Sequence, residues 1–124
     1  MSLDGGSVPL SAGATASAVG IETLGGVLTP LITIGTPVPG RRTEIFTTAQ
    51  DGQLSIRVNV FHGSGRSTVD AHLPGHYDLM LNESSARGVP QIQVTFAVGA
   101  DGVFHIEARD GRGREVWIAP ASAI

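Results

Sequence analysis

The chain has 124 residues, enough for one domain with a modest hydrophobic core. A formal net charge of −3 gives no reason to expect a nucleic acid or an anionic membrane as a partner. The absence of cysteine excludes disulfides, cysteine-ligated zinc and thiol catalysis, and it fits a reducing, cytoplasmic location. We see neither an apolar stretch near the ~18 residues of a membrane span nor the basic start and apolar core of a signal peptide.

The N-terminal segment, residues 4–19, is rich in glycine, serine and alanine and shows little periodicity. Such a composition is typical of a tail that does not fold by itself. We therefore expect residues 1–18 to form a flexible N-terminal tail or linker and residues 19–124 to form the folded domain.

The rest of the chain predicts short strands separated by turns. Seventeen glycines and seven prolines cut it into short pieces, which favours an all-β sandwich or barrel over a helical bundle. A first strand runs into the glycine pair at 25–26, and Pro30 places the next strand at a sheet edge or beside a bulge. The further expected strands comprise residues 27–34, 42–49, 54–60, 77–81, 91–98, 103–109 and 115–119.

The clearest strand is 54–60, where apolar and polar residues alternate so that one face is apolar. Asp51-Gly52 and Asp101-Gly102 predict tight turns before and after such strands. No segment shows a convincing helical pattern. Turns every eight to twelve residues are typical of a sandwich.

No motif for catalysis, metal binding or phosphate binding occurs in the sequence. None of the histidines shows a spacing that would place two ligands on one face of a strand or helix; these are His62, His72, His76 and His105. The chain also lacks Gly-x-Ser-x-Gly and a Walker-type loop. We expect no enzyme activity, no metal and no cofactor.

Five blocks point to a known family by their order and spacing. They are residues 20–26 (Gly-Ile-Glu-Thr-Leu-Gly-Gly), 46–53, 54–60, 88–96 and 100–106. From about Gly20 to Ala119 the chain resembles the peptide-binding β-sandwich of the heat-shock-70 (DnaK-type) chaperones. The resemblance implies an all-β, two-layer antiparallel sandwich of about eight strands in two four-stranded sheets. It also implies a role in protein folding and the stress response, in which the domain holds extended apolar segments of unfolded polypeptides.

The resemblance also implies a peptide site between two loops. Leu24 and Ala49 would form an arch over the peptide, and Asp51 and Arg87 would latch the outer loops. The side-chain pocket would be lined by Ile21, Phe46, Ile56, Val58 and Ile92. The peptide main chain would be held by backbone groups around Thr23, Leu24, Thr47, Ala49 and Gln53. On periodicity alone, the five pocket residues are equally typical of an ordinary sandwich core.

The N-terminal region departs from the family pattern. Val8-Pro-Leu-Ser11 is similar to a family motif displaced upstream, so either the first strand pairs differently or about eight residues bulge out. The ATPase domain and helical lid of the family are not expected in this chain. Two rival functions remain open. One is an interaction module on the same fold that binds one fixed partner or self-associates. The other is a small hydrolase, for which the sequence has no supporting motif. A terminal tail, residues 7–11 or 119–124, is expected to fill the groove of a second copy.

Overall fold

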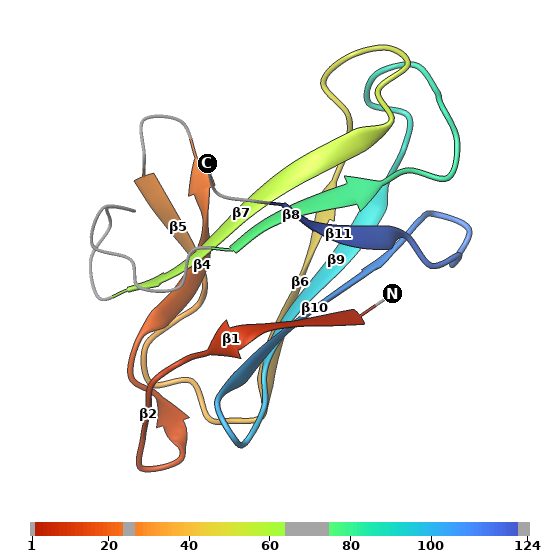
Figure 1. Cartoon of the computed structure of the whole chain (residues 1–124). Helices are drawn as coiled ribbons and strands as arrows, with labels where there is room; N and C mark the ends of the chain where they lie inside the picture. The colour runs from red at the N-terminus through yellow and green to blue at the C-terminus, as the bar shows by residue number, and fades with distance from the viewer. Residues whose placement is uncertain (1, 24–26, 64–74, 122–124) are drawn as a thin grey trace.

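The computed structural model describes residues 2–23, 27–63 and 75–121, and these form a two-layer β-sandwich (Figure 1). The predicted all-β class is confirmed, and no helix occurs in the described ranges. The strands are β1 (Ser2–Ser7), β2 (Leu10–Ser11), β3 (Ala14–Thr15), β4 (Ala18–Thr23), β5 (Val27–Ile32), β6 (Gly40–Phe46), β7 (Ser55–Gly63), β8 (Gly75–Met80), β9 (Ile92–Val98), β10 (Val103–Arg109) and β11 (Trp117–Ala121).

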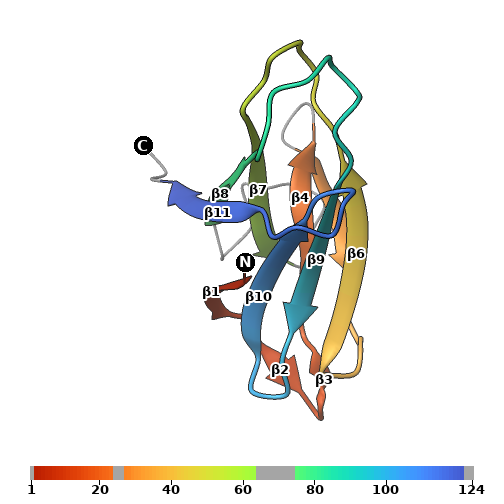
Figure 2. The same cartoon turned by 90° about the vertical axis from the view of Figure 1, so that its right-hand side faces the viewer.

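The sandwich has one sheet of four strands and one of five, with a separate two-stranded hairpin. The four-stranded sheet has the order β1-β10-β9-β6, and the five-stranded sheet has the order β11-β8-β7-β4-β5. Every pairing is antiparallel. Figure 2 shows the two layers, with β10, β9 and β6 in front of β7 and β4. The sequence predicted about eight strands in two four-stranded sheets, and the described part contains additional N-terminal strands.

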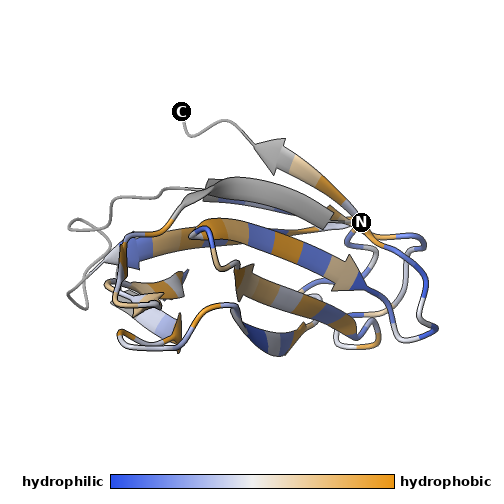
Figure 3. Cartoon of the chain, turned by 90° about the horizontal axis from the view of Figure 1, so that it is seen from below, coloured by the Kyte–Doolittle hydropathy of each residue, from blue (hydrophilic) through white to orange (hydrophobic). Residues whose placement is uncertain are grey.

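The core lies between the two sheets and follows directly from the alternation in the sequence. Along β7, β9 and β10 every second residue is buried and its neighbours are more exposed. Figure 3 shows this pattern as alternating bands of hydropathy along the strands. The largest fully buried side chains are Phe96, Phe104, Leu79, Ile106 and Ile118.

The N-terminal segment differs from the flexible tail expected over residues 1–18. The backbone of β1 pairs with β10, from Ser2 opposite Glu107 to Ser7 opposite Val103. The Val8 side chain is buried, and its N–H donates to the Gly102 carbonyl at 2.7 Å. An edge strand needs only backbone partners in an existing sheet, so a segment without apolar periodicity can still be ordered there.

Residues between β1 and β4 leave the sheet as the β2–β3 hairpin, an arrangement that fits the bulge described by the second of the two alternatives for this region. Its turn has both central residues at positive φ, 53° at Ala12 and 78° at Gly13, the backbone that a two-residue hairpin prefers. The buried Thr15 fastens the hairpin because its hydroxyl donates to the Thr33 carbonyl at 2.8 Å and accepts from the Thr36 N–H at 3.1 Å.

The strand that precedes the first predicted loop requires glycine at one position. A Cβ on Gly20 would collide with the carbonyl oxygen of Thr29 on β5. The β4–β5 ladder shifts register between Val19 and Gly20, so the two backbones approach unusually closely there. Within the described ranges, we find no helix long and apolar enough to cross a membrane.

Candidate functional site

The five residues predicted to line a pocket come from both sheets, and all belong to or pack against one core cluster. Phe46 ends β6 and lies directly opposite Ile92, the first residue of β9. Ile56 lies at the start of β7, next to the loop that joins β6 to β7. On β4, Ile21 lies opposite Val60, one position along the same face from Val58. The fold therefore brings Phe46, Ile56 and Ile92 to the strand ends beside the 47–54 loop, while Val58 and Ile21 lie farther along the same core.

The five predicted pocket residues differ in how deeply they are buried. Ile56, Val58 and Ile92 are 8%, 3% and 2% exposed, as core residues are. Ile21 and Phe46 are only partly buried and pack against the same core cluster. The Phe46 ring meets Phe96 edge to face at 6.3 Å between centroids. The core therefore approaches the surface at this end through Ile21 and Phe46.

The 47–54 loop is closed by the side chain of Gln53, a residue for which the resemblance implied only a backbone role. The Gln53 side-chain oxygen accepts from the N–H groups of Ala49 at 3.0 Å and Gln50 at 3.3 Å. Its side-chain NH₂ group donates to the Ser55 carbonyl at 2.6 Å. One of the donors expected near the peptide, the Ala49 N–H, is thus already engaged by Gln53, while Ala49 itself is exposed on the loop.

The structure brings Asp51 and Arg87 together, as the latch hypothesis requires, but through the main chain. A carboxylate oxygen of Asp51 accepts a hydrogen bond from the backbone N–H of Arg87 at 2.9 Å. Within the described residues, these two side chains form no ion pair. The role of the pair in holding a peptide stays a prediction.

Further bonds fasten the 47–54 loop to the segment from 82 to 91. The carbonyl and the hydroxyl oxygen of Thr48 both accept from the Gly88 N–H at 3.1 Å. The Thr47 hydroxyl donates to the Pro90 carbonyl at 2.5 Å. Thr48 is buried, although the sequence gave no reason to prefer it to Thr47. Because glycine and proline contribute only backbone here, their partners could not be read from side-chain types.

The arch cannot be compared with the prediction in full. Leu24 lies outside the described residues, as does the side chain of Thr23. The Thr23 backbone ends β4 and pairs with Val27 at the start of β5. The two strands therefore lead into the loop that was predicted to carry half of the arch.

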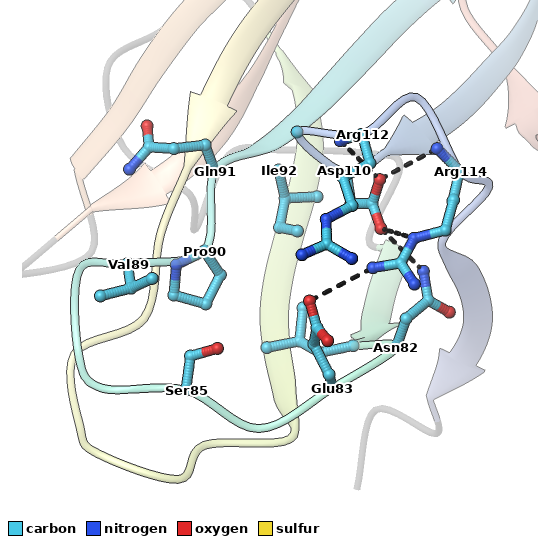
Figure 4. A pocket seen from close by; sticks show the side chains of 12 residues that line it. Asn82, Glu83, Ser85, Val89, Pro90, Gln91, Ile92, Asp110, Arg112 and Arg114 are labelled. Carbon is cyan, nitrogen blue, oxygen red and sulfur yellow. Dashed lines mark hydrogen bonds and ion pairs between the residues drawn. The ribbon is translucent and has the colours of Figure 1, made fainter.

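A second polar cluster, which the sequence analysis missed, fastens the other side of the 82–91 segment. The two carboxylate oxygens of Asp110 accept from the backbone N–H groups of Arg112 and Arg114 (each 2.9 Å), from the Arg114 guanidinium (2.7 Å) and from the Asn82 side chain (3.1 Å) (Figure 4). The Arg114 guanidinium also reaches Glu83 at 3.3 Å.

This bonding pattern sets the charge of Asp110. Burial by itself raises the pKa of the carboxyl group, but the hydrogen bonds from Arg114, Asn82 and Arg112 outweigh it and hold the pKa at about 2. The group is therefore a permanent anion at neutral pH. An Asp-Gly-Arg-Gly sequence is typical of a turn and indicates nothing more, because backbone donors leave no mark in the sequence. Among the described residues, no group of three or more histidine, aspartate or glutamate side chains could hold a metal ion.

Comparison with known proteins agrees with the resemblance drawn from the residues. The family model described as Hsp70 protein matches residues 12–119. The chain belongs to the Hsp70 family. It is 44% identical over 101 residues to a "Chaperone protein DnaK" of Anaplasma marginale (strain St. Maries), a match covering 81% of this chain and 16% of that protein. It is 40% identical over 110 residues to "Heat shock protein hsp-6" of Caenorhabditis elegans, covering 88% of this chain and 17% of that protein.

The chain thus spans about a sixth of the length of these Hsp70 relatives. The matched region begins inside the β2–β3 hairpin and continues into β11, so it includes both loops of the candidate site. Strand β1 lies before it.

Proposed function

We propose that this Hsp70-family domain binds extended, apolar segments of unfolded polypeptides, as the substrate-binding part of a chaperone. The observation that carries the proposal is that Ile21, Phe46, Ile56, Val58 and Ile92, from two sheets, all belong to or pack against one core, and that Phe46, Ile56 and Ile92 lie at the strand ends beside the 47–54 loop. The names of the two relatives, a chaperone protein and a heat shock protein, support it.

Such a site combines two kinds of recognition. Main-chain hydrogen bonds ignore the sequence of the peptide, and one apolar pocket selects a buried side chain. Four or five bonds of roughly 0.5–1.5 kcal/mol each and one buried leucine-sized side chain of roughly 1.5–3 kcal/mol give about 4–10 kcal/mol before ordering costs. We therefore expect micromolar or weaker affinity for a short peptide.

The proposal also includes the absence of nucleotide binding and of hydrolase activity. We expect this chain to bind no nucleotide and to hydrolyse nothing, because its sequence has no phosphate-binding loop and no paired nucleophile and base. Saturable, stoichiometric heat on titration with ATP and magnesium would contradict this. The cytoplasmic location stays a prediction, which cell fractionation tests.

A larger side chain at a buried position of the predicted peptide pocket tests whether this pocket holds the peptide. Val58→Phe should weaken binding of a leucine-centred peptide at least tenfold, because the larger ring occupies the volume that the peptide side chain needs. Overpacking a buried position also costs about 1–3 kcal/mol of stability. Val60→Phe is the matched control because Val60 is on the same strand and face, equally buried, but outside the predicted pocket.

Fluorescence polarisation gives the affinity of each variant, and thermal melting gives its stability. The proposal predicts similar melting temperatures for the two variants and lost affinity only in Val58→Phe. Equal affinity in both variants would remove the pocket from these residues. A peptide array separates general chaperone binding from the rival, a module with one fixed partner, which would retain a single sequence.

A further inference from the structure

A pocket of about 230 Å³ lies on the far side of the 82–91 segment, away from the 47–54 loop, and is closed by the turn between β10 and β11 (Figure 4). We call it the accessory pocket. One part of its lining is apolar, and the facing part is charged. The apolar part consists of Leu81, Val89, Pro90 and Ile92. The charged part includes Glu83, Asp110, Arg112 and Arg114.

Most of the charged wall is already engaged in bonds within the protein. Asp110 accepts four hydrogen bonds, and Arg114 bridges Asp110 and Glu83. The Arg112 guanidinium, by contrast, makes no hydrogen bond or ion pair with any residue that the structure describes. Figure 4 shows its side chain pointing into the pocket rather than away from it. The accessory pocket therefore presents one available cation beside an apolar surface.

We propose that the accessory pocket binds a small monocarboxylate with a short apolar chain. A guanidinium matches a carboxylate with two parallel hydrogen bonds, while the chain would lie against Val89 and Pro90. Val89 is 62% exposed, so a ligand there removes apolar surface from water. The volume is below the 300–1,000 Å³ usual for drug-sized ligands, which limits the chain to a few carbon atoms.

The neighbouring charges favour a single negative charge on the ligand. The four ionised side chains of the wall sum to zero, with two arginines against Glu83 and Asp110. A phosphate or dicarboxylate would bring a second negative charge close to these acids, which repel it. A monocarboxylate can pair with Arg112 alone. An alkylammonium ion would lack any partner except the already paired Glu83.

The location gives such a ligand an effect on peptide binding, a consequence that rests on the proposed function. The 82–91 segment lies between the two sites: its other side holds the 47–54 loop through Arg87 to Asp51, Gly88 to Thr48, and the Gly52 N–H to the Ser85 carbonyl at 2.9 Å. A ligand that orders this segment from behind should slow opening of the loop. We expect peptide release to slow at least twofold when the accessory pocket is filled.

Titration with hexanoate, followed by backbone amide NMR, tests the site in the whole chain. Saturable shifts confined to residues 81–92 and 110–114 are expected. Arg112→Gln should weaken hexanoate binding at least fivefold, and Val89→Ser should weaken it too. Arg41→Gln, which removes an exposed arginine on the edge strand β6 outside the accessory pocket, should change nothing. Hexylammonium and hexanol should bind at least fivefold more weakly than hexanoate.

Each other result counts against the proposal. Absent or dispersed shifts, equal binding of hexylammonium, or unchanged binding in Arg112→Gln would overturn the carboxylate site. N-acetyl-Ala-Leu with a free carboxylate binding much more tightly than hexanoate would reassign the pocket to polypeptide C-termini. Peptide off-rates with and without hexanoate test the coupling separately. If no peptide binds at all, the proposed function fails while the titration still decides the pocket.

Discussion

Single residues at the candidate peptide site act through the backbone of their partners. The Asp51 carboxylate holds the N–H of residue 87, and Thr48 holds that of residue 88. A substitution of the donor residue leaves its N–H in place, whereas a substitution of the acceptor removes the bond. Acceptor and donor residues at this site are therefore expected to differ sharply in their sensitivity to mutation.

For the loop latch, we predict that Asp51→Ala speeds peptide release by about three- to tenfold, since an exposed hydrogen bond contributes about 0.5–1.5 kcal/mol. Arg87→Ala should leave the off-rate within twofold, because the alanine N–H still donates. Stopped-flow release of a labelled peptide measures both. An effect of Arg87→Ala as large as that of Asp51→Ala would show that the arginine side chain, and not the main chain, forms the latch.

Asp110 gives the protein a defined response to acid. Its pKa in the folded chain is about 2, below the ordinary value of 3.8. A lowered folded pKa stabilises the protein above the unfolded pKa, and this contribution is lost as the pH falls from about 4 toward 2. The melting temperature should fall through this window less steeply in Asp110→Asn than in the parent chain. Asp101→Asn, an exposed aspartate at another turn, is the comparison. Parallel pH profiles for the parent and Asp110→Asn would contradict the assignment.

The residue-level site was predicted only where side-chain type carries the information. The apolar alternation of β7 predicted that Ile56 and Val58 share one face, and both are buried in the core cluster against which Phe46 packs. Their role in a peptide pocket came from the family resemblance and stays a prediction. The contact between Asp51 and Arg87 was also anticipated, but the nature of the bond was not. Backbone donors have no sequence signature, so neither the main-chain latch nor the two backbone bonds to Asp110 could be derived from the printed residues.

At the scale of elements, strands with strong alternation were predicted closely. Residues 91–98 and 103–109 were expected as a hairpin, and β9 and β10 comprise Ile92–Val98 and Val103–Arg109. The edge strand β6 carries charged residues whose effect the alternation pattern did not predict. Arg42 and Glu44 lie opposite the buried Phe96 and Val94, yet their side chains stay accessible to solvent and pair with each other at 2.9 Å. Charged side chains on an edge strand discourage pairing with another chain.

Replacing one residue of the β2–β3 hairpin, Ala12, should raise the stability of the protein. Ala12 has φ 53°, which strains a residue with a Cβ by roughly 1–2 kcal/mol. Ala12→Asn would give an Asn-Gly turn, the sequence that this hairpin backbone prefers, and should raise the unfolding free energy by about 0.5–1 kcal/mol. Thermal melting should show a rise of about 2–5 °C. Ala100→Asn, at a turn position without positive φ, should give no such gain; equal gains would point to a cause other than backbone strain.

At the scale of the whole molecule, the N-terminal segment decides which strand forms one edge of the four-stranded sheet. The sequence favoured a mobile tail over residues 1–18 because the segment lacks an apolar period. In the structure, β1 instead forms one edge of the four-stranded sheet, and Val8 joins the core. The self-binding expected from residues 7–11 loses its basis, because Leu10 is held in the hairpin. For the C-terminal candidate, β11 includes residues up to Ala121, and residues 122–124 lie outside the described part.

The last prediction therefore concerns β1. If it pairs with β10, the amide hydrogens of residues 2–7 that face β10 should exchange with solvent far more slowly than those of an unfolded segment. Deleting residues 1–7 should lower the unfolding free energy by roughly 2 kcal/mol or more, because it removes a ladder and uncovers the core beside Val8. It should also expose the edge of β10 and increase self-association with concentration.

Hydrogen exchange followed by mass spectrometry, thermal melting and sedimentation measure these three effects. A truncated chain that keeps its melting temperature and stays monomeric, together with unprotected amides at residues 2–7, would restore the flexible tail. Leu3→Pro offers a milder test in the intact chain, since proline removes a backbone donor from the ladder opposite Ile106, whose own N–H and C=O face β1. Leu3→Val, which keeps that donor, should stay close to the parent chain, because the strand is held by its backbone.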